Sequence, residues 1–174
     1  LESSYRFNTA SSLLRGWIEE IPVMKLFVRF YSRLEDAPPV NRPSSLGAVA
    51  LIEWDGKVLL EERSDCGLWG FVGGKVEDGE TVTQALHREV REESGLELES
   101  AVFFGLFSNP GRIIAYPDGG VKRIVTAVFR AVPHPGQTPR VSEESRSLRW
   151  WAWDEIDEAA LVETHWDILR AVRS

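Results

Sequence analysis

Residues 73–96 read Gly-Gly-Lys-Val-Glu-Asp-Gly-Glu-Thr-Val-Thr-Gln-Ala-Leu-His-Arg-Glu-Val-Arg-Glu-Glu-Ser-Gly-Leu, which is a glycine turn, an acidic loop and a helix. The helix is predicted from a cap at Thr81 to Ser94, because threonine is a favoured N-cap and nothing between the two breaks a helix. Gly95 then supplies the left-handed residue that often follows a helix. Apolar side chains recur every four residues and predict one buried stripe of Val82, Leu86 and Val90.

The last turns of this helix carry three glutamates. Glu89, Glu92 and Glu93 stand at positions i, i+3 and i+4, so they share one neighbouring face. Their like charges repel by about 0.2–0.5 kcal/mol per exposed pair, at the helix end where the dipole favours cations. Arg88 can offset part of this by pairing with Glu92. The cluster is either a solvated acidic face or a site for a hard divalent cation that takes oxygen ligands.

The wider spacing distinguishes these two interpretations. Gly74 is followed after five residues by Glu80, and after seven more by residues 88–96, Arg-Glu-Val-Arg-Glu-Glu-Ser-Gly-Leu. This pattern matches the Nudix box at every defining position, so the chain resembles the small MutT-like Nudix hydrolases. The resemblance extends over roughly residues 45–172. One departure is Val72, which stands where many relatives have a proline before the glycine pair.

The resemblance implies an α/β/α sandwich and metal-dependent hydrolysis of a phosphoanhydride bond. The metal, Mg²⁺ or Mn²⁺, would be held by Glu89, Glu92, Glu93 and the carbonyl of Gly74. Glu89 or Glu93 would also serve as the general base. Arg88 would hold the carboxylates through ion pairs, and Glu80 would brace the loop or hold a metal through water.

Five residues outside the box complete the predicted site. Glu144 precedes the last predicted strand, where relatives often place a further carboxylate, and is either a metal ligand or base, or a plain surface acid. Arg112 and Lys122 could contact substrate phosphates or simply face solvent. Trp69 and Tyr116 could stack on a base. For most of the seven tryptophans, however, a core position is the simpler assignment.

Composition limits the class of protein and its partners. The chain has 174 residues, 43% of them apolar, which suits one domain with a proper core. A net charge of −7 and a pI near 5.1 argue against a nucleic-acid polymer as partner. The single cysteine, Cys66, excludes a disulfide framework and fits a cytoplasmic protein. Neither a signal peptide nor an apolar run long enough to span a membrane is recognised.

Two parts of the chain are predicted. Residues 1–43 form an N-terminal helical extension and linker, and residues 44–174 form the Nudix domain. The extension is expected to hold helices over about 9–21 and 23–34, before a linker rich in proline. The basic edge of the second helix could meet a membrane surface or a partner, although packing with a solvated edge is the simpler interpretation. The extension could also form a homodimer.

Within the domain, short alternating patterns predict strands separated by turns. Strands are expected over 46–54, 57–63, a short segment before 73, 98–108, 113–116, 121–132 and 148–153. Asp55-Gly56 predicts a tight hairpin turn, Asp154 the cap of a short helix, and residues 162–172 a terminal helix. Strands interleaved with few helices favour a mixed sheet between helices, in the α/β class.

The box predicts hydrolysis of a phosphoanhydride bond but does not indicate which group leaves. Short loops after the helix favour a small substrate, so a nucleoside 5′-di- or triphosphate is the preferred prediction. ADP-ribose or a nucleotide sugar is the alternative, because Pro110 lies 14 residues past the box, near a proline of ADP-ribose-type relatives. A hypothesis of another class is a module that binds a nucleotide and regulates a partner. The complete set of glutamates argues against it.

Overall fold

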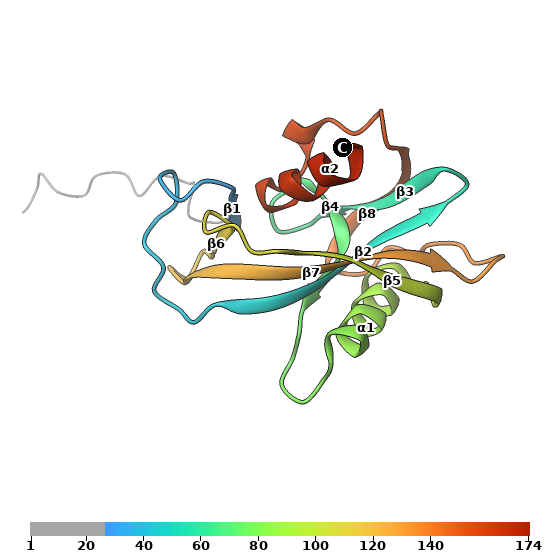
Figure 1. Ribbon diagram of the computed structural model, residues 1–174, viewed down its shortest axis with the longest axis horizontal. Helices are drawn as coiled ribbons and strands as arrows, with labels where there is room; N and C mark the ends of the chain where they lie inside the picture. Colours follow the sequence, from blue (N-terminus) through green and yellow to red (C-terminus); the bar gives the residue numbers. More distant parts are fainter. Residues whose placement is uncertain (1–26) are drawn as a thin grey trace, which may run out of the picture.

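The computed structural model describes residues 27–174 (Figure 1). The helix predicted over about 9–21 lies outside the described residues, as does the start of the one predicted over 23–34. The described part of the latter contains strand β1, Arg29–Tyr31, so the prediction of a helix there was wrong. β1 pairs antiparallel with β6, Ile113–Ala115. Pairing with a sheet edge therefore overrides the helical spacing of the basic side chains.

Eight strands form one sheet in residues 27–174. Besides β1 and β6 they are β2 (Ser45–Trp54), β3 (Lys57–Arg63), β4 (Trp69–Lys75), β5 (Leu98–Phe107), β7 (Val121–Pro133) and β8 (Ser145–Ala152). The order is β1-β6-β7-β2-β4-β3-β8, and β5 also pairs with β7. β2 and β7 run parallel, and the other pairs are antiparallel. This confirms the predicted mixed sheet.

Two α-helices cover opposite faces of this sheet (Figure 1). Because side chains alternate along a strand, Ala48, Ala50 and Ile52 of β2 pack towards α1 (Val82–Ser94). Val49 and Leu51 pack towards α2 (Trp166–Arg173) on the other face. Two apolar cores thus sandwich the sheet, and the α/β/α fold is confirmed. No helix in this part of the chain is long and apolar enough to cross a membrane.

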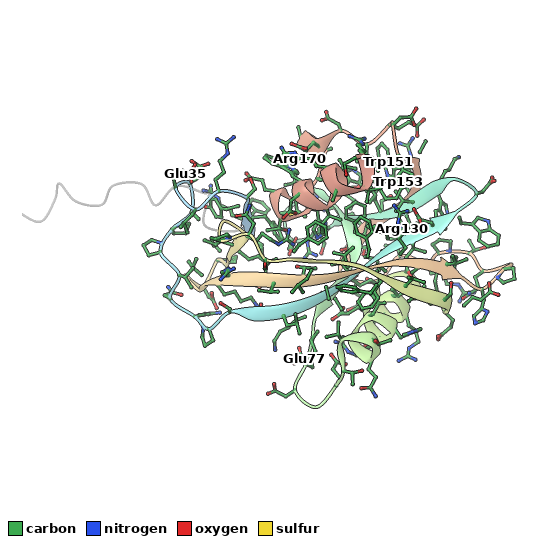
Figure 2. The ribbon with its side chains drawn as sticks, viewed as in Figure 1. Glu35, Glu77, Arg130, Trp151, Trp153 and Arg170 are labelled. Atoms are coloured by element: carbon green, nitrogen blue, oxygen red, sulfur yellow. The ribbon has the colours of Figure 1, made fainter. Side chains whose placement is uncertain are left out.

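The C-terminal part differs in detail from the prediction. The short helix expected after Asp154 is a single 3-10 turn, Glu158–Ala160, capped by Asp157. A second 3-10 turn, Glu163–His165, leads into α2, which therefore begins four residues later than predicted. Trp151 and Trp153 of the adjoining segment lie on the α2 side of the sheet (Figure 2). Both tryptophans are partly buried and pack against the core on this face.

Helix α1 has the boundaries that its sequence predicts. The Thr81 hydroxyl accepts a hydrogen bond from the Gln84 amide at 3.2 Å, and the Gln84 side chain accepts one from the Thr81 amide at 2.8 Å. This reciprocal capping box fixes the start of the helix. Gly95 ends it with φ 68°. Leu86 and Val90 are fully buried, so they fix this helix against the sheet and with it the backbone positions of the glutamates.

Candidate active site

Arg88 connects the acidic loop to the glutamates of α1. Its guanidinium donates to both carboxylate oxygens of Glu80, at 2.7 and 3.1 Å. The same group donates to Glu89 at 2.8 Å and to Glu92 at 3.1 Å, and a further bond reaches the Lys75 carbonyl at 3.0 Å. The hydrogen bonds from Arg88 lower the pKa of Glu80 to about 2. Arg88 therefore braces the loop and holds two glutamates, as the resemblance implies.

Glu93 lies inside the protein, unlike the half-buried Glu89 and the exposed Glu92. Its carboxylate accepts a hydrogen bond from the Gly73 amide at 2.7 Å. Burial, followed by the nearby charge of Glu61, raises the pKa of Glu93 well above its ordinary value. Burial also raises the pKa of Glu89. Both carboxylates therefore hold a proton more readily than an exposed glutamate.

The glycine pair brings the backbone of β4 against these carboxylates. A Cβ atom on Gly74 would lie 2.5 Å from the Glu89 carboxylate carbon. Gly73 has φ 144°, and a Cβ atom there would lie 2.2 Å from the Ala48 carbonyl oxygen. At Gly73 the obstacle is backbone, so a side chain does not fit. At Gly74 it is the end of the Glu89 side chain, which a larger residue would displace. The glycines thus allow close approach to β2 on one side and to the helix on the other.

Glu61 is a buried carboxylate that the sequence interpretation missed. It accepts a hydrogen bond from the Ser145 hydroxyl at 2.7 Å, and its other oxygen lies 3.4 Å from Arg63. Its charge raises the pKa of Glu93, and burial raises its own pKa. The available signal was strand alternation. Glu61 stands two residues after Leu59, which packs on the α1 face, so the two side chains share that face.

Glu144 lies in the loop before β8, as predicted. Its carbonyl accepts hydrogen bonds from the amide and hydroxyl of Ser64, at 2.9 and 2.6 Å, which tie this loop to the end of β3. Burial raises the pKa values of Glu61 and Glu89, and the negative charge of Glu144 adds to this effect on both. The exposed Glu144 side chain is therefore within electrostatic reach of the helix carboxylates.

The donor set fits a hard divalent cation. Glu89, Glu92, Glu93 and the Gly74 carbonyl offer only oxygen atoms, which Mg²⁺ and Mn²⁺ prefer. In the conformation described for residues 27–174, however, no three acidic, histidine or cysteine side chains converge as a ready ligand group. In this conformation Arg88 is bonded to Glu89 and Glu92, and Glu93 is bonded to the Gly73 amide.

A cleft on the α2 face of the sheet ends at the glycine pair. Its lining residues come from β1, β2, β4, β6 and β7, the end of β3 and the segment before α2. Arg63, Gly73 and Gly74 form the end nearest the carboxylates. Tyr116 and Lys122 line the same cleft, and the predicted contacts of the Tyr116 ring with a base and of Lys122 with phosphates stay predictions. Gly74 pairs with Ala48 of β2, which pairs with Ala127 of β7. Lys122 is five residues along β7 from Ala127, which is roughly 17 Å at the rise of a strand.

Two of the predicted substrate contacts lie elsewhere. Arg112 is buried and bonds to Thr126 at 2.9 Å, to Asp167 and to the Thr164 carbonyl. It joins β7 to the segment before α2, which corrects the expectation that Arg112 contacts substrate phosphates. Trp69 packs edge-to-face on Trp151, with ring centroids 5.3 Å apart, and does not line the cleft. This corrects the expectation that Trp69 stacks on a base.

His165 lines the cleft and is held as a neutral ring. Its Nδ1 accepts a hydrogen bond from the Phe71 amide at 3.1 Å, and burial lowers its pKa well below the ordinary value. The unfolded chain takes up a proton near pH 6.5, whereas the folded chain does so only at lower pH. The free energy of unfolding is therefore expected to fall as the pH drops below about 6.5, by up to about 1.4 kcal/mol per pH unit.

Urea unfolding at about pH 7.5 and pH 5.5 measures this effect. His165→Asn keeps an acceptor for the Phe71 amide but cannot titrate, so its stability should change less between the two pH values. Equal changes in the two proteins would show that His165 does not contribute to the pH dependence.

Comparison with known proteins agrees with this geometry. The NUDIX domain family matches residues 41–172. A MutT-like protein of Streptomyces ambofaciens is 34% identical over 122 residues, which are 70% of this chain and 71% of that protein. An oxidized purine nucleoside triphosphate hydrolase of Danio rerio is 34% identical over 116 residues, 65% of this chain and 69% of that protein. A crystal structure of a MutT Nudix hydrolase from Burkholderia pseudomallei shares the fold with TM-score 0.60 and 31% identity, covering 76% of this chain and 99% of that chain.

A capped acidic helix set against a glycine pair in an α/β/α sandwich defines a Nudix-type hydrolase. Because the NUDIX domain family matches residues 41–172, the chain belongs to the Nudix family. Within that family it is similar to MutT-like proteins. It is accordingly a pyrophosphohydrolase.

Proposed function

We propose that this protein is a divalent-metal-dependent hydrolase that cleaves a phosphoanhydride bond of nucleoside 5′-di- or triphosphates. The observation that carries the proposal is the meeting of the cleft and the carboxylates at Gly73 and Gly74. The cleft ends on the two glycines, and Glu93 and Glu89 contact the same backbone from the helix. A nucleotide lying in the cleft would present its phosphates to the glutamates.

In this proposal, Glu89, Glu92, Glu93 and the Gly74 carbonyl hold Mg²⁺ or Mn²⁺. When bound, the cation neutralises charge on the phosphates and activates water. Arg88 positions Glu89 and Glu92 through its hydrogen bonds. Glu89 or Glu93 accepts the proton of the attacking water, and burial, which raises both pKa values, makes each carboxylate a better proton acceptor than an exposed glutamate. Glu144 assists as a further carboxylate near Glu89.

The choice of substrate rests on relatives and on the cleft. The Danio rerio relative is named an oxidized purine nucleoside triphosphate hydrolase, and its match of 116 residues extends well beyond the box. ADP-ribose or a nucleotide sugar remains the alternative. Pro110, the residue that suggested it, is not among those that line the cleft. The simple nucleotides are therefore preferred.

A turnover panel tests the proposal. Ribo- and deoxynucleoside di- and triphosphates, ADP-ribose and nucleotide sugars are incubated with Mg²⁺ or Mn²⁺, and products are separated by chromatography. The wild-type protein should hydrolyse the simple nucleotides, and a chelator should stop the reaction. Glu89→Gln should lower kcat by about 10²–10⁴-fold, because it removes a carboxylate from the reaction centre.

Glu99→Gln is the matched control, since Glu99 is exposed on β5, and it should retain full activity. Turnover confined to ADP-ribose or sugars would replace the proposed substrate with the alternative. Turnover that persists in the chelator and in Glu89→Gln would refute the metal-dependent mechanism.

A further inference from the structure

We propose that β1, which lies upstream of the matched family domain, supplies Phe30 as a specificity-determining residue that contacts the base of the nucleotide. The family match begins at residue 41, and β1 covers Arg29–Tyr31. The inference rests on the proposed function, because it concerns the same cleft. It adds a wall to the cleft from outside residues 41–172.

Strand register places Phe30 in one row with residues of β6 and β7 that line the cleft. Phe30 pairs with Ile114 of β6, and Ile114 pairs with Lys122 of β7. Paired residues project to the same face of a sheet, so these three side chains form one row. Val28 and Tyr116 each lie two residues further along their chain segments and belong to the same face. All five residues line the cleft.

This row suits an aromatic heterocycle. Phe30, Ile114 and Val28 offer apolar contact, and Tyr116 offers a ring with the Lys122 ammonium 4.9 Å from its centroid. Lys122 has no carboxylate partner among the residues that the structure describes, so its donors are available to ring nitrogens or carbonyl oxygens of a base. Its distance from the glycine pair places it away from the reacting phosphates.

At the Phe30 end of the row the charged side chain is Arg63, which, unlike Lys122, is paired with carboxylates. The Arg63 guanidinium lies 5.4 Å from the Phe30 ring centroid, but its charge is already matched. It bonds to both oxygens of Asp65, at 2.7 and 3.0 Å, and approaches Glu61 at 3.4 Å. Arg63 is therefore a fixed wall between Phe30 and the carboxylates. The buried Thr164 hydroxyl also lines the cleft and finds no hydrogen-bond partner within residues 27–174, so a bound ligand can satisfy it.

β1 is held firmly enough to serve as a wall. The Ser32 amide and hydroxyl both donate to the Glu163 carboxylate, at 3.1 and 3.3 Å. A Cβ atom on Gly111 would lie 2.3 Å from the Ser32 carbonyl oxygen, so the two backbones touch. Further along, the Asn41 amide donates to the Val121 carbonyl at 3.0 Å. The segment after β1 thus follows the β6–β7 hairpin and keeps Phe30 in place.

The test compares Phe30→Leu with Tyr31→Leu in the 174-residue chain. Tyr31 is the next residue of β1, projects to the other face and does not line the cleft. Purine and pyrimidine nucleoside triphosphates are used as substrates, and binding of a non-hydrolysable triphosphate analogue is measured by calorimetry. Phe30→Leu should raise KM and the analogue's Kd by about five- to tenfold, from loss of a base–aromatic contact. It should also alter the purine-to-pyrimidine preference and leave kcat within about twofold.

Tyr31→Leu should change none of these quantities. A uniform loss of kcat for all bases after Phe30→Leu, with KM and Kd unchanged, would overturn the inference, because Phe30 would then act only through Arg63. The calorimetry separates this failure from that of the proposed function. If the wild type binds the analogue but hydrolyses no nucleotide, the proposed function fails, and the Kd of Phe30→Leu still tests the role of Phe30.

Discussion

Glu93→Gln is expected to lower kcat by about 10²–10⁴-fold while the folded protein becomes no less stable. The loss follows from the removal of the buried carboxylate at the end of the cleft, which is proposed as metal ligand or base. The fold persists because glutamine keeps an oxygen that can accept the Gly73 amide hydrogen bond. The substitution therefore separates catalysis from folding at one residue.

The stability of this variant should depend on pH in a defined direction. Glu93 has a raised pKa in the folded state because of its burial and the charge of Glu61. Wild-type stability is therefore lost as the pH rises above the ordinary glutamate pKa of about 4.5, whereas a neutral glutamine does not incur this loss. The advantage of Glu93→Gln in free energy of unfolding should grow as the pH rises towards neutrality.

Steady-state kinetics with Mg²⁺ and urea unfolding at several pH values measure the two effects. Glu99→Gln, at an exposed position of β5, provides the baseline for replacing one carboxylate. Retained activity would remove Glu93 from the reaction centre. A large fall in stability would show that the charge of Glu93 stabilises the fold, contrary to the argument from burial.

Gly73→Ala is expected to lower the free energy of unfolding by about 2–5 kcal/mol. Two costs add, because φ 144° is strained for an L-residue and the new Cβ would lie 2.2 Å from the Ala48 carbonyl oxygen. That carbonyl belongs to the backbone of β2, which is paired with β4 on one side and with β7 on the other. It therefore cannot move away as the end of a flexible side chain can.

Gly79→Ala is a matched control for the backbone strain. Gly79 also has a positive φ, 89°, but nothing lies within 4 Å of a Cβ there. It should lose only about 1 kcal/mol. Urea midpoints at constant slope measure both variants. Equal losses would mean that the close approach to Ala48 contributes nothing and that β4 shifts freely.

The local elements could be predicted because their signals are contained in neighbouring residues. Helix α1 follows from Thr81, Gln84 and Gly95, which satisfy its own ends. The hairpin at Asp55-Gly56 follows from two residues that adopt positive φ, 52° and 72°. Spacing within the box likewise identified Arg88 and its glutamates. The division at residues 43 and 44, a homodimer and a cytoplasmic location stay predictions.

Three outcomes required the tertiary structure. β1 forms because the edge of β6 accepts its backbone, although its own sequence spacing favours a helix. Arg112 is drawn into the core by Asp167, which is 55 residues away in the chain. Trp69 is covered by Trp151 from a distant strand. In each case the deciding partner is remote in sequence, so local pattern could not show whether the side chain faces substrate or core.

The sequence by itself determined the family of this protein, since one helix with its caps carries the glutamates and Arg88 at the spacing of the Nudix box. Only the tertiary structure decided what surrounds them. It brought Glu61 beneath Glu93, where burial raises both pKa values, and it laid β1 along the cleft. The physical reason is that a helix sets its own periodicity through local hydrogen bonds, whereas burial and strand pairing depend on segments far apart in the chain.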